Sequence, residues 1–459
     1  MRLKLGPALL ALLTVAPPLG AESLSRADAV ARALEVNPDV QKGVQDLIRL
    51  DGLITEARAD ALPELTAYGS FTRYRDPAFL NSSSFDKFPP EFKDQLQPVP
   101  ANVYEGSAQL KQTIFSFKLG HAIHAAHYGH AFGEEDLRRV KQLVALVAVQ
   151  AYNDFLLGLE RVRIAEKSVR QKELQLEVAR NRRAAGVATD IDVLRFQVNL
   201  ENDRATLVRE QGSADIARGR LNAVMVRPID APITPTDALA YVPFEVGIDA
   251  AVREAWEGRP EARAVALQEK IRHELVGVAA GDALPSLDFN GAYGWSVREP
   301  QNFFNQDFAK WAFGVSLKVP LFDGFRTSAR VAQAKAEVSK VGQDRIALEN
   351  QIRLEAKDAV DRLHAAKLVL DAADLAVSLA QKALDMTEGS YKLGAASSLD
   401  VLDAQASLTQ ADSNRSQALY VHANARATLR YVMARDPLDD TPAAAPAPDP
   451  AAVGDERSR

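Results

Sequence analysis

Two matching stretches of the sequence carry acidic residues in an arrangement that could attract cations. The stretch 186–197 contains Asp192, and the stretch 394–405 contains Asp400 and Asp403. A spacing of three places the carboxylates of Asp400 and Asp403 on one face of a helix. The alternative is that these aspartates only favour the start of a helix, where the macrodipole stabilises negative charge.

A second group of side chains that could do chemistry is a stripe of four histidines that recur every three residues: His121, His124, His127 and His130. Histidines three apart on a helix are frequent metal ligands. A period of three drifts around a helix, however, and Glu134 and Glu135 come only after the stripe. We expect a solvated or interfacial stripe near the membrane and retain the four histidines as weak candidates for a metal site. No cofactor is expected.

Each acidic stretch lies at a turn between two long helical patterns. Gly186 and Gly394 suit the end of a helix because glycine tolerates positive φ, and polar residues after each glycine can cap the next helix. Proline is absent from about 120–184 and 327–389, and a helix of that length spans roughly 100 Å. Shorter return helices are predicted to follow each turn, so the chain contains two long helical hairpins.

The duplication extends beyond the turns. Pro38 and Pro260 lie in matching contexts at predicted helix starts, and Pro63 and Pro285 open predicted strands. These matches indicate an internal twofold repeat. We expect five segments: a signal peptide over 1–21, a first repeat over 22–227, a linker over 228–250, a second repeat over 251–436 and a disordered tail over 437–459.

Alternating patterns predict four strands, two in each repeat. In 287–297 and 311–319 every second residue is apolar and mostly large, while the residues between are mainly small or polar. The alternation is weaker in 65–74 and 104–114. We expect a lipid-facing row on these strands that includes Phe289, Tyr293, Trp295, Trp311, Phe313, Val315 and Leu317.

Composition places the chain outside the cytoplasm and away from nucleic acid. Arg2 and Lys4 precede an apolar run, as in a secretory signal peptide. The formal net charge is −6, and removal of the signal makes it more negative, which argues against nucleic-acid binding. The absence of cysteine excludes disulfides, thiolate metal sites and a lipid anchor on an N-terminal cysteine. Past the signal, no run predicts a transmembrane helix.

Four strands with an apolar face cannot enter lipid alone. An open sheet leaves unpaired edges, and about eight strands is the smallest usual closed barrel. The chain must therefore contribute its strands to an oligomer. A trimer supplies twelve strands and a dimer eight, and physical argument alone leaves both open.

The N-P-D and R-P-E helix starts, the A-L-P-x-L strand starts, Leu321-Phe322-Asp323-Gly324 and the doubled G-x(5)-D-V-L turn together resemble the TolC-type outer-membrane efflux family. The resemblance implies a mixed α+β membrane protein: a homotrimer with a twelve-stranded barrel in outer-membrane lipid and a periplasmic tunnel of helical hairpins. It implies the exit duct of a tripartite efflux or type I secretion system in a Gram-negative bacterium. The implied partners are a periplasmic adaptor and an inner-membrane pump of RND or ABC type.

The resemblance also suggests roles for individual residues. Asp400 and Asp403 match the acidic rings that narrow the periplasmic entrance, and Asp192 and Tyr391 match residues of the links that hold the tunnel shut. The arginine of those links falls on Ala396, so one link is expected to be missing. The turns are expected to contact the adaptor through four residues, unless they serve only to end helices: Gly186, Val187, Gly394 and Ala395.

The sequence contains no nucleophile elbow, phosphate-binding glycine loop or H-E-x-x-H motif, so no enzyme is expected. The main alternative to a duct is a periplasmic coiled-coil adaptor or scaffold that never enters the membrane. The four alternating strands argue against it, because an adaptor needs no lipid-facing row. The cargo is left open among drugs, metal ions, siderophores and proteins.

Overall fold

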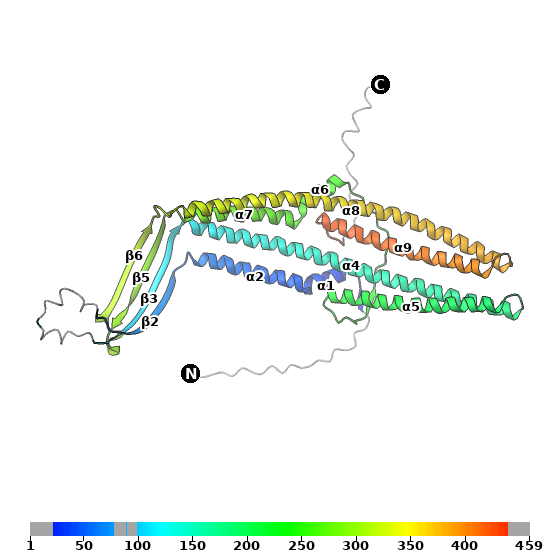
Figure 1. Cartoon of the computed structure of the whole chain (residues 1–459), viewed down its shortest axis with the longest axis horizontal. Coiled ribbons are helices and arrows are strands. Elements are labelled where there is room, and N and C mark those ends of the chain that lie inside the picture. The colour runs from blue at the N-terminus through cyan, green and yellow to red at the C-terminus, as the bar shows by residue number, and fades with distance from the viewer. Residues whose placement is uncertain (1–21, 78–88, 90–98, 439–459) are drawn as a thin grey trace, which may run out of the picture. The chain divides into compact units, whose positions relative to one another are not determined.

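The computed structural model describes residues 22–77, 89 and 99–438 (Figure 1). The predicted signal peptide, most of the first loop between strands and nearly all of the predicted tail lie outside the described residues. The chain divides into two compact units. The helical unit takes Met1–Val44, Glu135–Ala262 and Ala347–Arg459, and the sheet unit takes Gln45–Glu134 and Arg263–Ile346.

The main elements occur in the same order twice, which agrees with the predicted mixture of helices and strands. The first run is α1 (Arg26–Val36), α2 (Pro38–Ala59), β2 (Glu64–Tyr74), β3 (Ala101–Ser116), α4 (Phe117–Ala184) and α5 (Asp190–Val224). The second run is α6 (Ile248–Gly258), α7 (Pro260–Gly281), β5 (Ser286–Val297), β6 (Ala309–Lys318), α8 (Arg326–Lys392) and α9 (Ser398–Val432). Two short strands were not predicted, β1 (Glu22–Leu24) and β4 (Ile233–Pro235), which pair in parallel.

The sheet unit contains the four predicted strands. They form one antiparallel sheet in the order β2-β3-β5-β6 (Figure 1), which leaves β2 and β6 at the two edges. The register pairs Tyr293 with Trp311 and Gly291 with Phe313, so the aromatic residues of β5 and β6 lie on one face. Polar pairs lie on the other face, where Thr113 donates a hydrogen bond to Asp288 (3.0 Å). The alternation in the sequence therefore becomes two chemically different faces.

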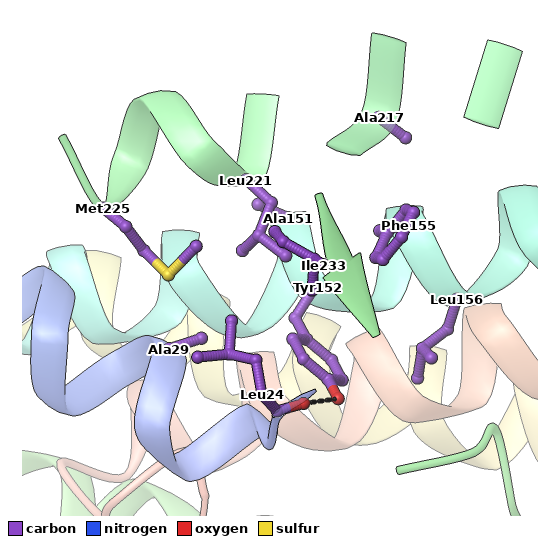
Figure 2. Close-up of a cluster of buried hydrophobic side chains, with 10 residues drawn as sticks. All are labelled: Leu24, Ala29, Ala151, Tyr152, Phe155, Leu156, Ala217, Leu221, Met225 and Ile233. Carbon is purple, nitrogen blue, oxygen red and sulfur yellow. Dashed lines mark hydrogen bonds between the residues drawn. The ribbon is translucent and has the colours of Figure 1, made fainter. Parts of the chain in front are cut away.

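In the helical unit, one hairpin is formed by α4 and α5 and the other by α8 and α9, and the two hairpins lie side by side. The apolar clusters connect α4 mainly with α5, and α8 with α9. A close-up of one cluster shows Tyr152 of α4 fully buried, with its hydroxyl donating to the carbonyl of Leu24 (2.8 Å; Figure 2). Leu221 and Met225 pack there from the end of α5. The short strands β1 and β4 thus fasten the start of the described chain to the middle of the first hairpin.

One helix bears on the expectation that no run predicts a transmembrane helix. The helix α4 contains a window with mean hydropathy 1.3, long and apolar enough by composition to cross a membrane. Within the protein 67% of the window is buried, and the core helix of a soluble protein passes the same compositional test.

Candidate gate at the hairpin turns

Both hairpin turns are built from the same backbone hydrogen bonds. Gly186 has φ 78° and Gly394 has φ 79°, a region that glycine adopts without strain. The amide of Val187 donates to the carbonyl of Arg182, and the amide of Ala395 donates to that of Ser390 (both 2.9 Å). These are Schellman turns, which satisfy carbonyls at the helix ends. The four predicted turn residues therefore have a structural role, whether or not they also contact an adaptor.

The helix after each turn begins with a capping box. The amide and hydroxyl of Ser397 both donate to Oδ2 of Asp400 (2.8 Å each), and the amide of Asp400 donates back to the Ser397 hydroxyl. These hydrogen bonds, the backbone one first, lower the pKa of Asp400. Thr189 and Asp192 repeat this geometry at the first turn. One oxygen of Asp400 is thus already used within its own helix start.

Asp403 lies one turn further along α9 in a different environment. It lines a cavity of about 500 Å³ between α4, α5 and α9. Lys172 and Asp203 line the same cavity, and the hydroxyl of Ser168 donates to Asp203 (2.6 Å). Burial is the main cause that lowers the pKa of Lys172. Asp400 and Asp403, adjacent on one helix face by spacing, therefore have different contacts.

Two contacts join the hairpins at the turns. Nη1 of Arg182 donates to the carbonyl of Tyr391 (3.0 Å), and the guanidinium carbon lies 4.3 Å from the centre of the Tyr391 ring. The hydroxyl of Ser398 donates to Oδ1 of Asp192 (2.9 Å). The sequence reasoning found Tyr391 and Asp192 but missed Arg182, which comes from α4 and not from the position of Ala396. We call these two contacts, Arg182–Tyr391 and Asp192–Ser398, the latch.

Above the latch, α4 meets α9 mainly through polar side chains. The hydroxyl of Tyr420 donates to Asp154 (2.6 Å), and burial and this carboxylate raise the pKa of Tyr420 to about 12. Four further pairs link the same two helices: Asn153–Asn424, Arg161–Gln417, Lys167–Asp412 and Gln171–Gln405. We call these five pairs the polar ladder. It follows the boundary between the two hairpins.

The histidine stripe divides between two neighbouring helices of the sheet unit. His121 and His124 face Glu274 of α7, with Nδ1 to Oε2 distances of 2.6 and 3.9 Å. A Cβ on Gly277 would lie 2.5 Å from the His121 ring, so α7 approaches α4 closely there.

The other two histidines turn toward α2. Nη2 of Arg58 lies 2.9 Å from Nε2 of His127. Nε2 of His130 lies 3.2 Å from Oδ1 of Asp51. A period of three drifts around the helix and produces this division. Among the described residues, no group of three or more His, Cys, Asp or Glu side chains is placed to hold a metal ion.

The predicted lipid-facing residues lie where the alternation places them. On β6, Trp311, Phe313, Val315 and Leu317 are all more than half exposed. On β5, Tyr293 and Trp295 contact each other edge to face, and Phe303 and Phe304 from the following loop also contact Trp295. The row presents an extended apolar surface that would be costly in water.

Comparison with known proteins identifies the class. The outer membrane efflux protein family matches residues 29–225 and 251–435. The alkaline protease secretion protein AprF of Pseudomonas aeruginosa is 24% identical over 89% of this chain and 84% of its own length. The outer membrane protein TolC of Escherichia coli is 22% identical over 87% of this chain and 81% of its length. A crystal structure of a membrane protein from Pseudomonas aeruginosa superposes with a TM-score of 0.76 at 22% identity, covering 89% of this chain and 92% of that one.

The fold and these matches define an outer-membrane channel. The matching family consists of transport proteins rather than enzymes. The chain belongs to the outer membrane efflux protein family, which confirms the TolC-type resemblance and the location in the outer membrane of a Gram-negative bacterium. The comparisons favour the exit duct over the periplasmic adaptor that the sequence left as an alternative.

Proposed function

We propose that this chain forms a homotrimeric exit duct with a twelve-stranded barrel, closed at its periplasmic end by the hairpin turns. The observation that carries the proposal is the open sheet, whose two edge strands have no partner strand among the described residues. Because the four strands alternate in direction, β2 and β6 run opposite ways. An edge β6 can therefore pair with β2 of the next copy in the same antiparallel pattern, and closure removes every edge.

The helical unit supports the same closure. Its hairpins place α5 at one side and α8 at the other (Figure 1). Both outer helices carry apolar residues at coiled-coil spacing that are more than half exposed. On α5 these are Ile191, Leu194, Val198 and Val208, and on α8 they are Leu368, Leu375, Leu379 and Met386. We propose that α8 of one copy packs on α5 of the next.

The duplicated element order supports an internal twofold repeat, with boundaries at 22–227 and 251–436 around a linker over 228–250. In this proposal the acidic gate comprises Asp403, whose carboxylate lines the cavity beside α9, together with Asp400. Three copies would bring three carboxylates of each kind together and favour cations. The latch, with Asp192 and Tyr391, holds the two hairpins of each copy in place.

The partners follow from the same class of protein. We propose that the turns at 186–187 and 394–395 contact a periplasmic adaptor, which connects the duct to an inner-membrane pump of RND or ABC type. The relative AprF is named for alkaline protease secretion and the family for efflux. Either system would use the same duct.

A disulfide test addresses the trimer directly, because the chain contains no cysteine. Leu194 and Met386 lie equally far along their helices from the turn glycines. The double variant Leu194→Cys/Met386→Cys should form covalent trimers in isolated outer membranes after mild oxidation. The matched control Leu194→Cys/Gln381→Cys moves the second cysteine off the apolar row and should remain monomeric in denaturing gels. A water-soluble monomer in the periplasmic fraction would refute the duct.

A further inference from the structure

The Leu321-Phe322-Asp323-Gly324 motif, to which neither the gate nor the sheet gives a role, forms an exposed apolar turn between β6 and α8. Leu321 is 94% exposed and Phe322 is 75% exposed. Phe325, directly after the motif, has φ 65°, a backbone region that is unfavourable for a residue with a side chain. Large apolar side chains that are exposed together commonly mark an interaction site. The turn therefore needs a partner that a single copy does not supply.

The two strand hairpins of the sheet repeat each other residue for residue. In the internal repeat, Glu64 matches Ser286 and Lys111 matches Lys318. The structure pairs Glu64 with Lys111 and Ser286 with Lys318, so β2–β3 and β5–β6 have the same register. The sheet thus contains one unit twice, and the two units meet where β3 pairs with β5. In a closed sheet, β6 meets β2 of the next copy at the corresponding place, so the β3–β5 contact is a template for it.

One pair at the β3–β5 contact is a leucine opposite a glycine, Leu110 and Gly291. The repeat places Leu317 of β6 and Gly69 of β2 at the corresponding positions, so the same two residue types would meet between copies. Leu317 is 66% exposed within one copy. A Cβ on Gly69 would meet only a backbone oxygen, at 3.9 Å, so the space over this glycine is open. Leu317 of one copy can therefore pack over Gly69 of the next.

A second pair at the same contact involves the motif. The pairing of β3 with β2 ends at Lys111, but β3 continues beyond it by pairing with β5 alone. There, after a β-bulge, Phe115 lies opposite Leu287. The corresponding residues of the two edges are Phe322 and Leu65, again the same two types. Leu65 is 72% exposed, as is expected of a residue whose partner lies on another copy.

The segment after β6 is suited to continue the strand. β6 ends where its pairing with β5 ends, and residues 319–322 have no strand partner among the described residues. Pro320 corresponds to Thr113, the residue after which the register of β3 and β5 shifts. Proline lacks an amide donor and is tolerated in strands at bulges. The one proline of this segment therefore falls at the position where the template has its bulge.

The motif also contains the end of this pairing. The same register would place Asp323 opposite Glu64 of the next copy, and like charges directly opposite each other are unfavourable. The carboxylate of Asp323 instead accepts a hydrogen bond from the amide of Thr327 (2.8 Å), in the first turn of α8. The helix thus begins where continued strand pairing would become repulsive.

We propose that residues 319–322 extend β6 along β2 of the next copy, with Leu317 opposite Gly69 and Phe322 against Leu65. This inference rests on the proposed trimer and goes beyond it, because it fixes the register between copies and assigns the motif to the contact. A shift by one residue would turn the lipid-facing row of β6 away from that of β2. A shift by two would keep the faces together, so the register itself has to be measured.

Cysteine pairs test the register in the full-length protein, in isolated outer membranes oxidised with copper phenanthroline. Leu317→Cys/Gly69→Cys should give covalent trimers in denaturing gels. The matched pairs Leu317→Cys/Ala67→Cys and Leu317→Cys/Phe71→Cys are shifted by two residues on the same face. They should cross-link about tenfold less, because diagonal neighbours lie about 7–8 Å apart, beyond the reach of a disulfide.

The possible failures are distinguishable. Stronger cross-linking of a shifted pair would overturn the register and leave the trimer intact. A monomeric protein without cross-links in any of the three variants would overturn the register and the proposed duct together.

Alanine substitutions test the contact of the motif. Phe322→Ala and Leu65→Ala should each lower the temperature at which trimers dissociate in semi-native gels by several degrees. The double variant should lose no more than the weaker single variant, because the two side chains share one contact. Phe115→Ala, the matched change within the chain, should instead add its full effect to that of Leu65→Ala. Additive losses for Phe322→Ala with Leu65→Ala, as expected if both side chains contact only lipid, would overturn the proposal.

Discussion

In the proposed trimer, removal of the Arg182 side chain should loosen the periplasmic end of the duct. Arg182 makes two contacts across the hairpin boundary, the hydrogen bond to the Tyr391 carbonyl and the stacking on the Tyr391 ring. A hydrogen bond from a charged donor contributes about 1.5–3 kcal/mol, and a partly exposed cation–π contact about 0.5–1 kcal/mol. Because the site is only part-buried, we take the lower range, about 2 kcal/mol for each copy.

That energy corresponds to about a 30-fold shift in the equilibrium for releasing one hairpin. If the three hairpins of a trimer move together, the total reaches about 6 kcal/mol. Arg182→Ala should therefore raise single-channel conductance in planar bilayers and lengthen open events. The Asp192–Ser398 contact remains, so Arg182→Ala combined with Ser398→Ala should increase conductance further.

The neighbouring arginine provides the control. Arg183 pairs with Asp190, which lies in the same hairpin. Arg183→Ala removes an equal charge at the same turn without touching the latch, and should leave conductance nearly unchanged. Equal effects of the two substitutions would show that charge at the entrance, not the latch, controls opening. Unchanged conductance in Arg182→Ala would refute the latch itself.

Three further predictions concern stability and selectivity. Val226 lies two residues after the end of α5 and has φ 52°, which is unfavourable for a β-branched residue. Val226→Gly should therefore stabilise the protein by about 0.5–1 kcal/mol, measured as a higher melting temperature by circular dichroism. Asp403→Asn should lower the cation-to-anion permeability ratio more than Asp400→Asn, because Oδ2 of Asp400 already accepts the hydrogen bonds of its capping box. Reversal potentials measure this ratio, and equal effects of the two substitutions would contradict the prediction. The hydrogen bond from Lys118, and then the one from Arg330, lower the pKa of Asp282. The ionised Asp282 therefore contributes to stability above pH 3.8, and this contribution is lost as pH falls through the lower folded-state pKa. Asp282→Asn should remove that acid sensitivity in melts from pH 5 to 2.

The local sequence pattern was enough to predict the elements that depend on residues close together in the chain. The strand alternation and the glycine turns depend on neighbours within a few residues, and both are present. The long helices begin and end within a few residues of the predicted bounds because proline-free runs and capping residues mark them.

Side-chain partners from distant segments could not be predicted. Arg182 is separated from Tyr391 by more than 200 residues, and only the packing of the two hairpins brings them together. Glu274 reaches His121 from another helix in the same way. The spacing of Asp400 and Asp403 suggested a common role, yet the hydroxyl of Ser397 engages one of them and a cavity receives the other. Spacing specifies a shared face but not what lies opposite that face.

The distribution of polar and apolar contacts explains which helices of the helical unit can move relative to one another. Apolar clusters join α4 with α5 and α8 with α9. Leu402 of α9 packs into a cluster of the first hairpin, and Leu239 of the linker packs against a cluster of each hairpin. The polar ladder and the latch also join the two hairpins, through polar side chains. Separating apolar surfaces costs free energy in proportion to area, whereas polar groups can exchange a protein partner for water at a small net cost. Each hairpin should therefore move as a unit, and displacement along the polar ladder is the least costly rearrangement of the helical unit.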